Sequence, residues 1–561
     1  MRNIRRFIVP VLLGIVLCLG LAPSAAFAAE AASTSKSKTA TNLDSNYESQ
    51  VTLSLPSEQE NLTSDVVFVV DASSCSSKAG AQAMAMLSDL AAQVESTDAT
   101  VNVGVVVFRG NTTSYNDGTL TKLDKTTASD LTSYCTDFDK HTLDAGSNLD
   151  AGLIKAKAML DGDTTTAAGR KYVVVISDGI TYTWDNDGEQ YGAAFETDGG
   201  PQFASNTAWE EAHGSLGWVP KDSKGNTDWA TYLDGSKSRI DATLTTYATP
   251  YDRKNIQNPI PHEEKIYDTY ADSVTVALYK SRAEFQSMVA EGYVCYSVPV
   301  SEADTAYQYG VPFMSYLGTL GAGTTTDFKS IQNDIYYLVG AGTTVTDYMG
   351  SGTDNMGNAY NFDFVNSASA LSLKVGSTTY QAVDLGNGSY AFGEKNDEGV
   401  YPYVLTYEPD NANGEAISLA FNVPVTNFDR VELTYSVKLT NPQTTAGTYG
   451  TFSADGSAGA TSLYTNNSAV LAPVDSEGKA GATEEFPKPT VSYTVAEPVT
   501  PTEPTQPTTD GGSTNQATTT KAKRSLSGVP ATSDATPYAV FGGIAALGAA
   551  AFLVSRKLRR D

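Results

Sequence analysis

The sequence of 561 residues has few histidines and cysteines, and it has none of the common catalytic motifs considered below. Its three histidines, His141, His213 and His262, stand in no metal-binding spacing such as HExxH. A GxSxG nucleophile elbow and a phosphate-binding GxxxxGKS loop are both missing. The chain is therefore predicted not to be an enzyme.

Basic side chains and cysteines are scarce as well. The 37 Lys and Arg residues stand against 64 Asp and Glu, which gives a formal charge of −27. Such a surface repels nucleic acid and anionic membranes, so neither is expected as a partner, while divalent cations can bind to it. Beyond Cys18 there are only Cys75, Cys135 and Cys295, too few for a scaffold stapled by disulfides.

Residues 1–28 have the layout of a secretory signal peptide. Arg2, Arg5 and Arg6 precede an apolar run over residues 7–21, and the small residues of Ala26-Phe27-Ala28 follow. The apolar run is short for a membrane anchor. The chain is therefore expected to be exported and to act outside the cell.

The C-terminal end has three parts in order. Val529-Pro530-Ala531-Thr532-Ser533 is followed by an apolar stretch over residues 538–554 and then by a basic tail. This order resembles the sorting signal of sortase substrates in Gram-positive bacteria, with Val for Leu and Ser for Gly in the LPxTG pentapeptide. The resemblance implies cleavage between Thr532 and Ser533 and attachment to peptidoglycan. A plain transmembrane anchor is the alternative, and in both cases only residues 529–561 would meet the membrane.

Low-complexity segments delimit the folded part. Residues 29–60 are predicted to be a flexible N-terminal segment, and residues 497–528, rich in Pro and Thr, a spacer through the cell wall. Cleavage at both ends would leave 30 basic and 62 acidic residues, a charge of −32. The residues between these segments suffice for two or three domains.

Residues 61–340 alternate between strand and helix patterns. Continuous apolar runs over residues 66–70, 101–108 and 172–177 indicate strands that are buried on both faces. Residues 274–279 are predicted to be a further strand, followed by a helix over residues 281–291 and a strand over residues 294–300. This alternation predicts an α/β fold with a doubly wound, Rossmann-like sheet, whose ligands bind beyond the carboxyl ends of the strands.

Three polar motifs follow those strands or begin a helix. They are Asp71-Ala72-Ser73-Ser74-Cys75, Gly146-Ser147-Asn148-Leu149-Asp150 and Ile176-Ser177-Asp178-Gly179. In this order they resemble the metal-ion-dependent adhesion site of the von Willebrand factor A (vWA) family. The resemblance implies that Asp71, Ser73, Cys75, Ser147 and Asp178 hold Mg²⁺, Mn²⁺ or Ca²⁺, and that an acidic side chain of a partner completes the coordination.

Cys75 departs from the family pattern, which has a serine there. A thiol is a poor ligand for Mg²⁺, so a vWA scaffold without metal is an alternative. Cys75 is either a free thiol, the preferred interpretation, or is paired with Cys135 in a disulfide, which export would permit.

Residues 181–272 are longer than the single helix expected at this point of a vWA domain. All four tryptophans of the chain lie here, namely Trp184, Trp209, Trp218 and Trp229. The insertion resembles the arms of vWA proteins at pilus tips and is predicted to influence partner choice. Because the predicted strands of the main sheet lie outside it, replacing residues 185–268 by a short linker is expected to preserve the domain.

Residues 341–496 change to short, often alternating runs separated by Gly, Asn and Asp. This pattern predicts an all-β sandwich, which would act as a stalk. Lys438, with Asn466 and Asn467, faintly resembles the Lys–Asn isopeptide sites of some Gram-positive stalk domains. A surface lysine and a turn asparagine are the alternative.

Together these features predict a wall-anchored bacterial adhesin that resembles sortase-anchored pilus-tip proteins and binds a host or bacterial protein or glycan through its metal site. The alternative is a structural stalk or pilus component with a metal-independent vWA scaffold. In both hypotheses the mature protein is extracellular, at the cell surface.

Overall fold

The computed structural model describes residues 34–498, apart from residues 75–76, 96, 98, 138–140, 204–219, 262–268, 301–308 and 459–462. The predicted signal peptide and sorting signal, with Thr532 and Ser533, lie outside these residues, as does the wall spacer from residue 499 onward. Within the described part of the chain, no helix is both long and apolar enough to cross a membrane.

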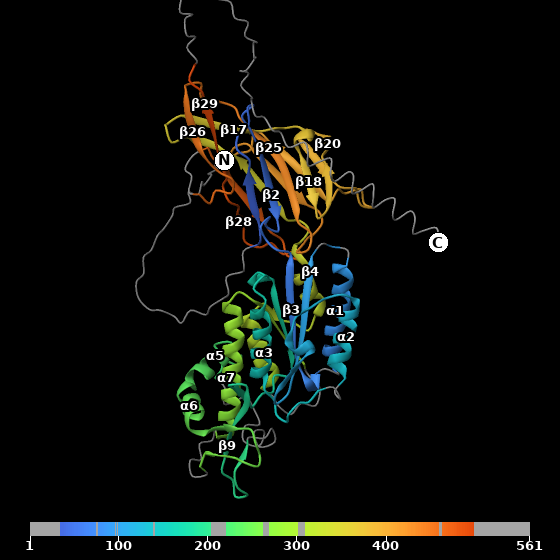
Figure 1. Cartoon of the computed structure of the whole chain (residues 1–561), viewed down its shortest axis with the longest axis vertical. Helices are drawn as coiled ribbons and strands as arrows, with labels where there is room; N and C mark the ends of the chain where they lie inside the picture. Colours follow the sequence, from blue (N-terminus) through green and yellow to red (C-terminus); the bar gives the residue numbers. More distant parts are fainter. Residues whose placement is uncertain are drawn as a thin grey trace, which may run out of the picture. The chain divides into compact units, whose positions relative to one another are not determined.

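A seven-stranded sheet forms the centre of the α/β domain (Figure 1). Its parallel centre has the order β12-β7-β3-β4, with bounds Val294–Pro299, Lys171–Ser177, Thr63–Asp71 and Thr100–Phe108. Every residue of β7 is buried, as are residues 64–71 of β3, which agrees with the continuous apolar runs of the sequence. Short strands complete the edges, namely β13 (Gly323–Thr324), β5 (Thr112–Ser114) and β6 (Thr121–Lys122).

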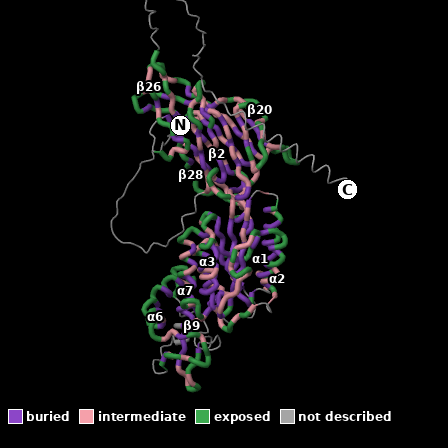
Figure 2. Tube along the Cα trace, in the orientation of Figure 1, coloured by how far each residue is buried: buried purple, intermediate pink, exposed green. Residues whose placement is uncertain are grey.

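Helices cover both faces of this sheet (Figures 1 and 2). On one face, Val66, Phe68 and Val70 of β3 pack with the helices α1 (Lys78–Val94), α2 (Lys125–Thr136) and α9 (Phe328–Tyr336). Val67 and Val69 on the other face pack with α3 (Leu149–Gly162), α7 (Thr269–Ala290) and α8 (Gly310–Leu320). This arrangement confirms the predicted doubly wound α/β fold.

Helix α7 corrects the prediction of a strand over residues 274–279. All residues from Ser273 to Leu278 are buried, because α7 lies between two cores. Val274 and Leu278 pack toward the sheet, whereas Val276 packs against the insertion. A helix that is covered on opposite sides is apolar all round, and a short apolar run of this kind cannot be told from a buried strand by periodicity.

The second domain is a sandwich of two mainly antiparallel sheets, as predicted. One sheet has the order β1-β2-β25-β17-β16, and β18 and β19 extend it from β25. The other has the order β20-β21-β22-β23-β15-β27-β28. The strands used below are β15 (Thr344–Met349), β17 (Ala359–Phe364), β20 (Val383–Gly386), β23 (Ala416–Phe421), β25 (Val431–Leu439), β27 (Asn466–Ala472) and β28 (Glu484–Glu485).

Two strands of this sandwich come from the segment before the α/β domain. The sequence predicts a flexible segment over residues 29–60, whereas the structure has β1 (Ser37–Ala40) and β2 (Glu48–Leu55) there. All eight residues of β2 pair with β25, and in Figure 1 β2 lies beside β25. Val51, Leu53 and Leu55 alternate with polar residues as in a strand, but this pattern is short and its partner strand lies far away in the sequence.

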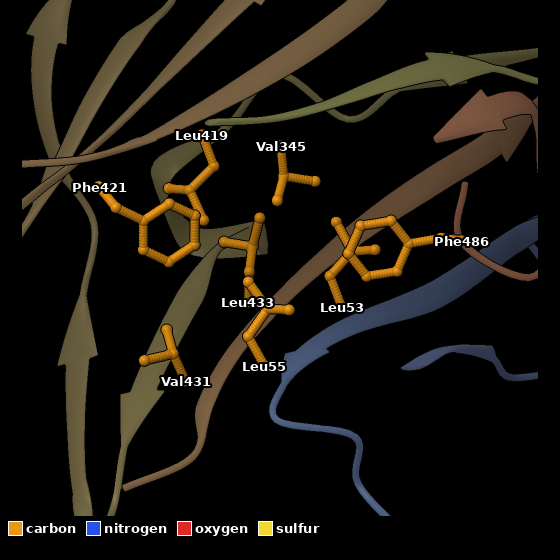
Figure 3. Close-up of a pocket in the computed structure, with 8 residues that line it drawn as sticks. All are labelled: Leu53, Leu55, Val345, Leu419, Phe421, Val431, Leu433 and Phe486. Atoms are coloured by element: carbon orange, nitrogen blue, oxygen red, sulfur yellow. The ribbon is translucent and has the colours of Figure 1, made fainter. Parts of the chain in front are cut away.

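The two sheets enclose a nearly continuous apolar core (Figure 3). Leu53 and Leu55 of β2 meet side chains of the opposite sheet, namely Val345 of β15 and Leu419 and Phe421 of β23. The cavity between them measures only about 10 Å³, so at most one water molecule fits, and its apolar walls offer that molecule no hydrogen bond. It is packed core rather than a ligand site.

Lys438 does not have the environment that an isopeptide bond requires. It lies on β25 with an exposed side chain, and its ammonium is 3.1 Å from a carboxylate oxygen of Glu48. Asn467 is also exposed, and its Nδ2 donates to Ser351 at 3.0 Å. The hypothesis that Lys438 is the bonding lysine is therefore wrong, and the surface interpretation applies to it.

Asp65 provides a test of the packing at the amino end of β3. Its carboxyl is fully buried and accepts a hydrogen bond from Nδ2 of Asn102 at 2.8 Å. Burial, reinforced by the negative charge of Asp163, raises its pKa to about 6. The unfolded chain loses this proton at lower pH than the folded chain, so stability falls as pH rises from about 4 to about 6.

We expect Asp65→Asn to remove this fall and to raise the free energy of unfolding at pH 7 by about 2 kcal/mol. An amide stays neutral in both states and keeps an oxygen for Asn102. Urea unfolding of the parent and the variant at pH 4 and pH 7 measures the effect, with the exposed Asp89→Asn as control. A variant that is less stable than the parent at pH 7 would contradict the argument.

Candidate metal centre

The candidate site lies at the carboxyl edge of the α/β sheet, where three loops meet. Asp71 is the last residue of β3, and Ser73 follows in the short helix η1 (Ala72–Ser74). Ser147 precedes the N-cap of α3, and Asp178 follows β7 directly. Because β3 and β7 are parallel neighbours, their carboxyl ends bring Asp71 and Asp178 to the same edge.

Asp71 is held by hydrogen bonds from its own loop and from the next strand. Its carboxylate accepts from the backbone amide of Ser73 at 2.9 Å and from the Ser73 hydroxyl at 2.6 Å. The hydroxyl of Ser177, at the end of β7, lies 3.4 Å away. Burial raises the pKa of Asp71, although these hydrogen bonds and the positive charge of Arg109 act to lower it.

Ser147 joins the second loop to the third. Its hydroxyl donates to the carbonyl oxygen of Ile180. Its own carbonyl oxygen accepts from the backbone amides of Tyr182 and Thr183, both at 3.1 Å. Asp178 accepts from the amide of Ile180 at 2.9 Å. The structure thus places all three predicted motifs in one hydrogen-bonded cluster.

The side chains of this cluster suit a hard divalent cation. Asp71 and Asp178 carry carboxylates, and Ser73 and Ser147 carry hydroxyls, so every donor is an oxygen. Ser73 is exposed, and Ser147 and Asp178 are half-buried, which leaves the edge open to a partner. The raised pKa of Asp71 indicates a buried carboxylate that a cation would stabilise.

Two further features bear on this site. The described residues contain no group of three or more His, Cys, Asp or Glu suited to a metal. Cys75 lies outside the described residues, and so does the proposed pairing with Cys135. Cys135 is buried in α2, and Cys295 is a buried free thiol whose pKa is raised by burial.

Asp150, in the first turn of α3, is a charged group to which sequence reasoning assigned no role. It is 2% exposed, and burial raises its pKa to about 6. Its carboxylate accepts from the backbone amide of Asp185 at 3.1 Å, and Nζ of Lys280 lies 3.8 Å away. Asp150 thereby connects the α3 loop to the insertion and to α7. Its place in the second motif, on an otherwise apolar helix face, is the signal that could have identified it.

The insertion has its own small sheet, which is held beside the loops of the candidate site. Its strands are β8 (Trp184–Asn186), β9 (Glu189–Phe195), β10 (Gln202–Phe203) and β11 (Ala248–Pro250). Nε2 of Gln190 on β9 donates to the carbonyl oxygen of Ala145 and to the Thr183 hydroxyl, both at 3.1 Å. Trp209 and Trp218 lie outside the described residues.

Two tryptophans of the insertion are buried in different cores. Trp184 packs within the insertion, with Phe195, Ile240 and Val276. Trp229 begins the helix α5 (Trp229–Gly235) and packs in the core of the α/β domain. Because Trp229 is part of that core, residues 185–268 are not expected to be removable without loss of stability, although the strands of the main seven-stranded sheet lie outside them.

Comparison with known proteins gives matches at the level of a domain and of a fold. Residues 66–180 match the family model of the von Willebrand factor type A domain. A search of the curated proteins found no match.

Three solved structures illustrate the similarity. The pilus adhesin SpaC from Lactobacillus rhamnosus GG, in its open conformation, is 14% identical, with 81% of this chain and 47% of that chain covered and a TM-score of 0.31. The present chain thus spans about half of SpaC. The adhesive tip pilin GBS104 from Group B Streptococcus agalactiae is 14% identical (82% and 92% covered, TM-score 0.27). The pilus adhesin RrgA from Streptococcus pneumoniae is 13% identical (82% and 65% covered, TM-score 0.24).

The family match falls on the central part of the α/β domain. It begins at Val66 in β3 and ends at Ile180, two residues after Asp178, and so contains all three motifs of the candidate site. The parallel sheet with helices on both faces agrees with it. This part of the chain is a von Willebrand factor type A domain.

Proposed function

We propose that this protein is a bacterial surface adhesin and not an enzyme. Its vWA domain would bind an extracellular protein or glycan through a divalent cation held by Asp71, Ser73, Ser147 and Asp178. The observation that carries the proposal is the meeting of three loops, with oxygen donors only, at an open edge of the sheet. When bound, the cation would offer a coordination position to an acidic group of the partner.

Different residues at this edge would bind the cation, position the loops and contribute to partner choice. The two carboxylates would balance the charge of a divalent cation without exceeding it, and the hydroxyls are neutral, so the cation could still accept an oxygen ligand from a partner. The hydrogen bonds of Ser147 with Ile180, Tyr182 and Thr183 would keep the second and third loops in place before a partner arrives. Gln190 places the insertion next to this surface, where it would contribute to partner choice.

Asp71→Ala is expected to weaken Mg²⁺ binding at least tenfold, because it removes a carboxylate that would bind the cation. This carboxylate is buried, so a positive charge beside it stabilises its ionised form. Isothermal titration of the purified protein with Mg²⁺ measures this, and Asp89→Ala, an exposed acid on α1, is the matched control. Equal Mg²⁺ affinity in both variants would place any metal elsewhere.

Partner binding separates the adhesin from a structural stalk. Immobilised matrix proteins and glycans are screened with Mg²⁺ and with EDTA, and binding that EDTA abolishes and Mg²⁺ restores supports the proposal. Binding that survives EDTA and Asp71→Ala indicates a metal-independent scaffold, the second hypothesis. This second hypothesis is supported by the Ser147 hydroxyl, which already donates a hydrogen bond to the carbonyl oxygen of Ile180.

We also propose that the chain is exported and that sortase joins Thr532 to peptidoglycan. Thr532→Ala should then leave the protein in the membrane or release it to the medium, because the acyl-enzyme formed at the threonine carbonyl would no longer arise. Muralytic digestion and immunoblotting detect the wall-linked ladder of the parent. An unchanged ladder in Thr532→Ala would contradict sortase attachment at this residue.

A further inference from the structure

A lysine is buried between the two sheets of the sandwich. Lys38 lies on β1, and its side chain is fully shielded from solvent. Its ammonium contacts the carboxylate of Asp347, which projects from β15 of the opposite sheet. The hydroxyl of Tyr435, on β25, donates to the same carboxylate oxygen of Asp347. Three strands from both sheets therefore meet at one carboxyl group.

A buried asparagine lies on β27, the strand that pairs with β15, and its carboxamide has no hydrogen bond within the described residues. Asn466, the first residue of β27, is fully buried, and within the described part of the chain neither its Oδ1 nor its Nδ2 has a hydrogen-bond partner. The second carboxyl oxygen of Asp347, Oδ1, is likewise unpartnered there. Buried amides are nearly always hydrogen-bonded. Two unsatisfied groups in one core therefore call for an explanation.

The strand register places these groups on the same inner surface. Val345, Asp347 and Met349 alternate inward along β15. Asp347 pairs with Ala469 of β27, and after an irregularity in the register Met349 pairs with Asn466. Because of that irregularity, the side chain of Asn466 is buried, whereas its neighbour Asn467 is exposed. Side chains at directly opposite and diagonal positions of adjacent strands lie close enough to interact.

The buried environment also favours the uncharged forms of Lys38 and Asp347. Desolvation lowers the pKa of Lys38 and raises the pKa of Asp347, although the attraction between them acts in the opposite direction. Transfer of one proton within the pair gives a neutral amine next to a carboxylic acid. A neutral amine has the lone pair that a nucleophile needs.

We propose that Lys38 and Asn466 are joined by an isopeptide bond, for which Asp347 is the catalytic acid and base. Nζ of Lys38 attacks Cγ of Asn466 while protonated Asp347 donates to Oδ1 of the amide. One proton then passes from Nζ, through the Asp347 carboxylate, to Nδ2 of Asn466. The Cγ–Nδ2 bond breaks, ammonia leaves, and the proton on Oδ1 returns to Asp347 as the carbonyl forms again. The reaction exchanges one amide for another and needs no oxidant, reductant or cofactor.

The bond would explain the unsatisfied asparagine and would change the connectivity of the chain. Residues 39–465, with the entire vWA domain, would become a closed covalent loop based in the sandwich. β1 could then no longer separate from the sandwich without breaking a covalent bond. This inference is independent of the metal site and of the partner that the vWA domain binds.

Peptide mapping of the full chain tests the proposal directly. Tryptic digestion and tandem mass spectrometry should find one branched peptide that contains both Lys38 and Asn466 and lacks the mass of one ammonia. The unlinked Lys38 and Asn466 peptides should be almost absent. Recovery of both peptides unlinked from the folded parent protein would overturn the proposal without recourse to any variant.

Variants then identify the role of each group. Asp347→Asn keeps the size of the side chain but cannot accept the proton, so both peptides should be recovered unlinked with Lys38 and Asn466 intact. Lys38→Met and Asn466→Ala should also prevent the link. The neighbouring Lys36→Met and Asn467→Ala are matched controls and should remain linked. A branched peptide that persists in Asp347→Asn would exclude Asp347 as the catalytic group, and one that persists in Lys38→Met would overturn the assignment of the lysine.

Discussion

A chain without residues 34–56 is expected to lose the β-sandwich and to retain the vWA sheet. This deletion removes β1 and β2, and β2 pairs with β25 along all eight of its residues. It also removes Val51, Leu53 and Leu55, each at most 5% exposed, from the sandwich core. Burial of each side chain stabilises the fold by about 1.5–3 kcal/mol. Together with the lost strand pairing, this loss approaches the whole stability of about 5–15 kcal/mol that is typical of a domain.

Thermal unfolding and limited proteolysis measure the outcome of this deletion. The sandwich should become protease-sensitive, while the vWA domain should retain a cooperative transition. Point variants provide a matched pair on β2: Leu53→Asp places a charge in the core and should act like the deletion, whereas Gln50→Asp, at an exposed position, should have little effect. A protease-resistant sandwich in the deleted chain would show that residues 341–496 fold alone, as the sequence predicts.

The vWA fold was predictable because its strands are buried on both faces and therefore form continuous apolar runs. The runs that end at Asp71 and near Asp178 also locate the loops of the candidate site, since parallel strands end at one edge. Helix α7 was not predictable in the same way. Its residues 273–278 are buried on opposite sides by two different cores, and this removes the polar face that marks an ordinary helix.

The sandwich was predictable as a class but not in its composition. Most of its strands alternate visibly, yet β1 and β2 lie on the other side of the vWA domain and pair with a strand far along the chain. The same separation conceals the contact of Lys38 with Asp347, which are 309 residues apart. A buried lysine cannot be recognised in a segment whose strand character is itself hidden, and this explains why the sequence directed attention to Lys438.

The second large effect is expected at Trp229, where the insertion enters the vWA core. Trp229 is 1% exposed, and its ring meets Phe313 of α8 edge-on, with centroids 5.6 Å apart and an interplanar angle of 77°. Tyr232 on the same helix packs against it at 6.2 Å. Trp229→Ala should therefore lower the free energy of unfolding of the vWA domain by about 3–5 kcal/mol.

Guanidinium unfolding of the full chain, followed through the vWA transition, measures this loss. Trp229→Phe fills most of the space and should retain most of the stability. Trp184→Ala provides the matched control, because Trp184 is just as buried but packs in the separate core of the insertion. It should increase proteolysis within residues 185–260 and shift the vWA transition much less. Equal shifts for Trp229→Ala and Trp184→Ala would show that the insertion and the vWA domain unfold as a single unit, and that no part of the insertion can be exchanged without loss of the domain.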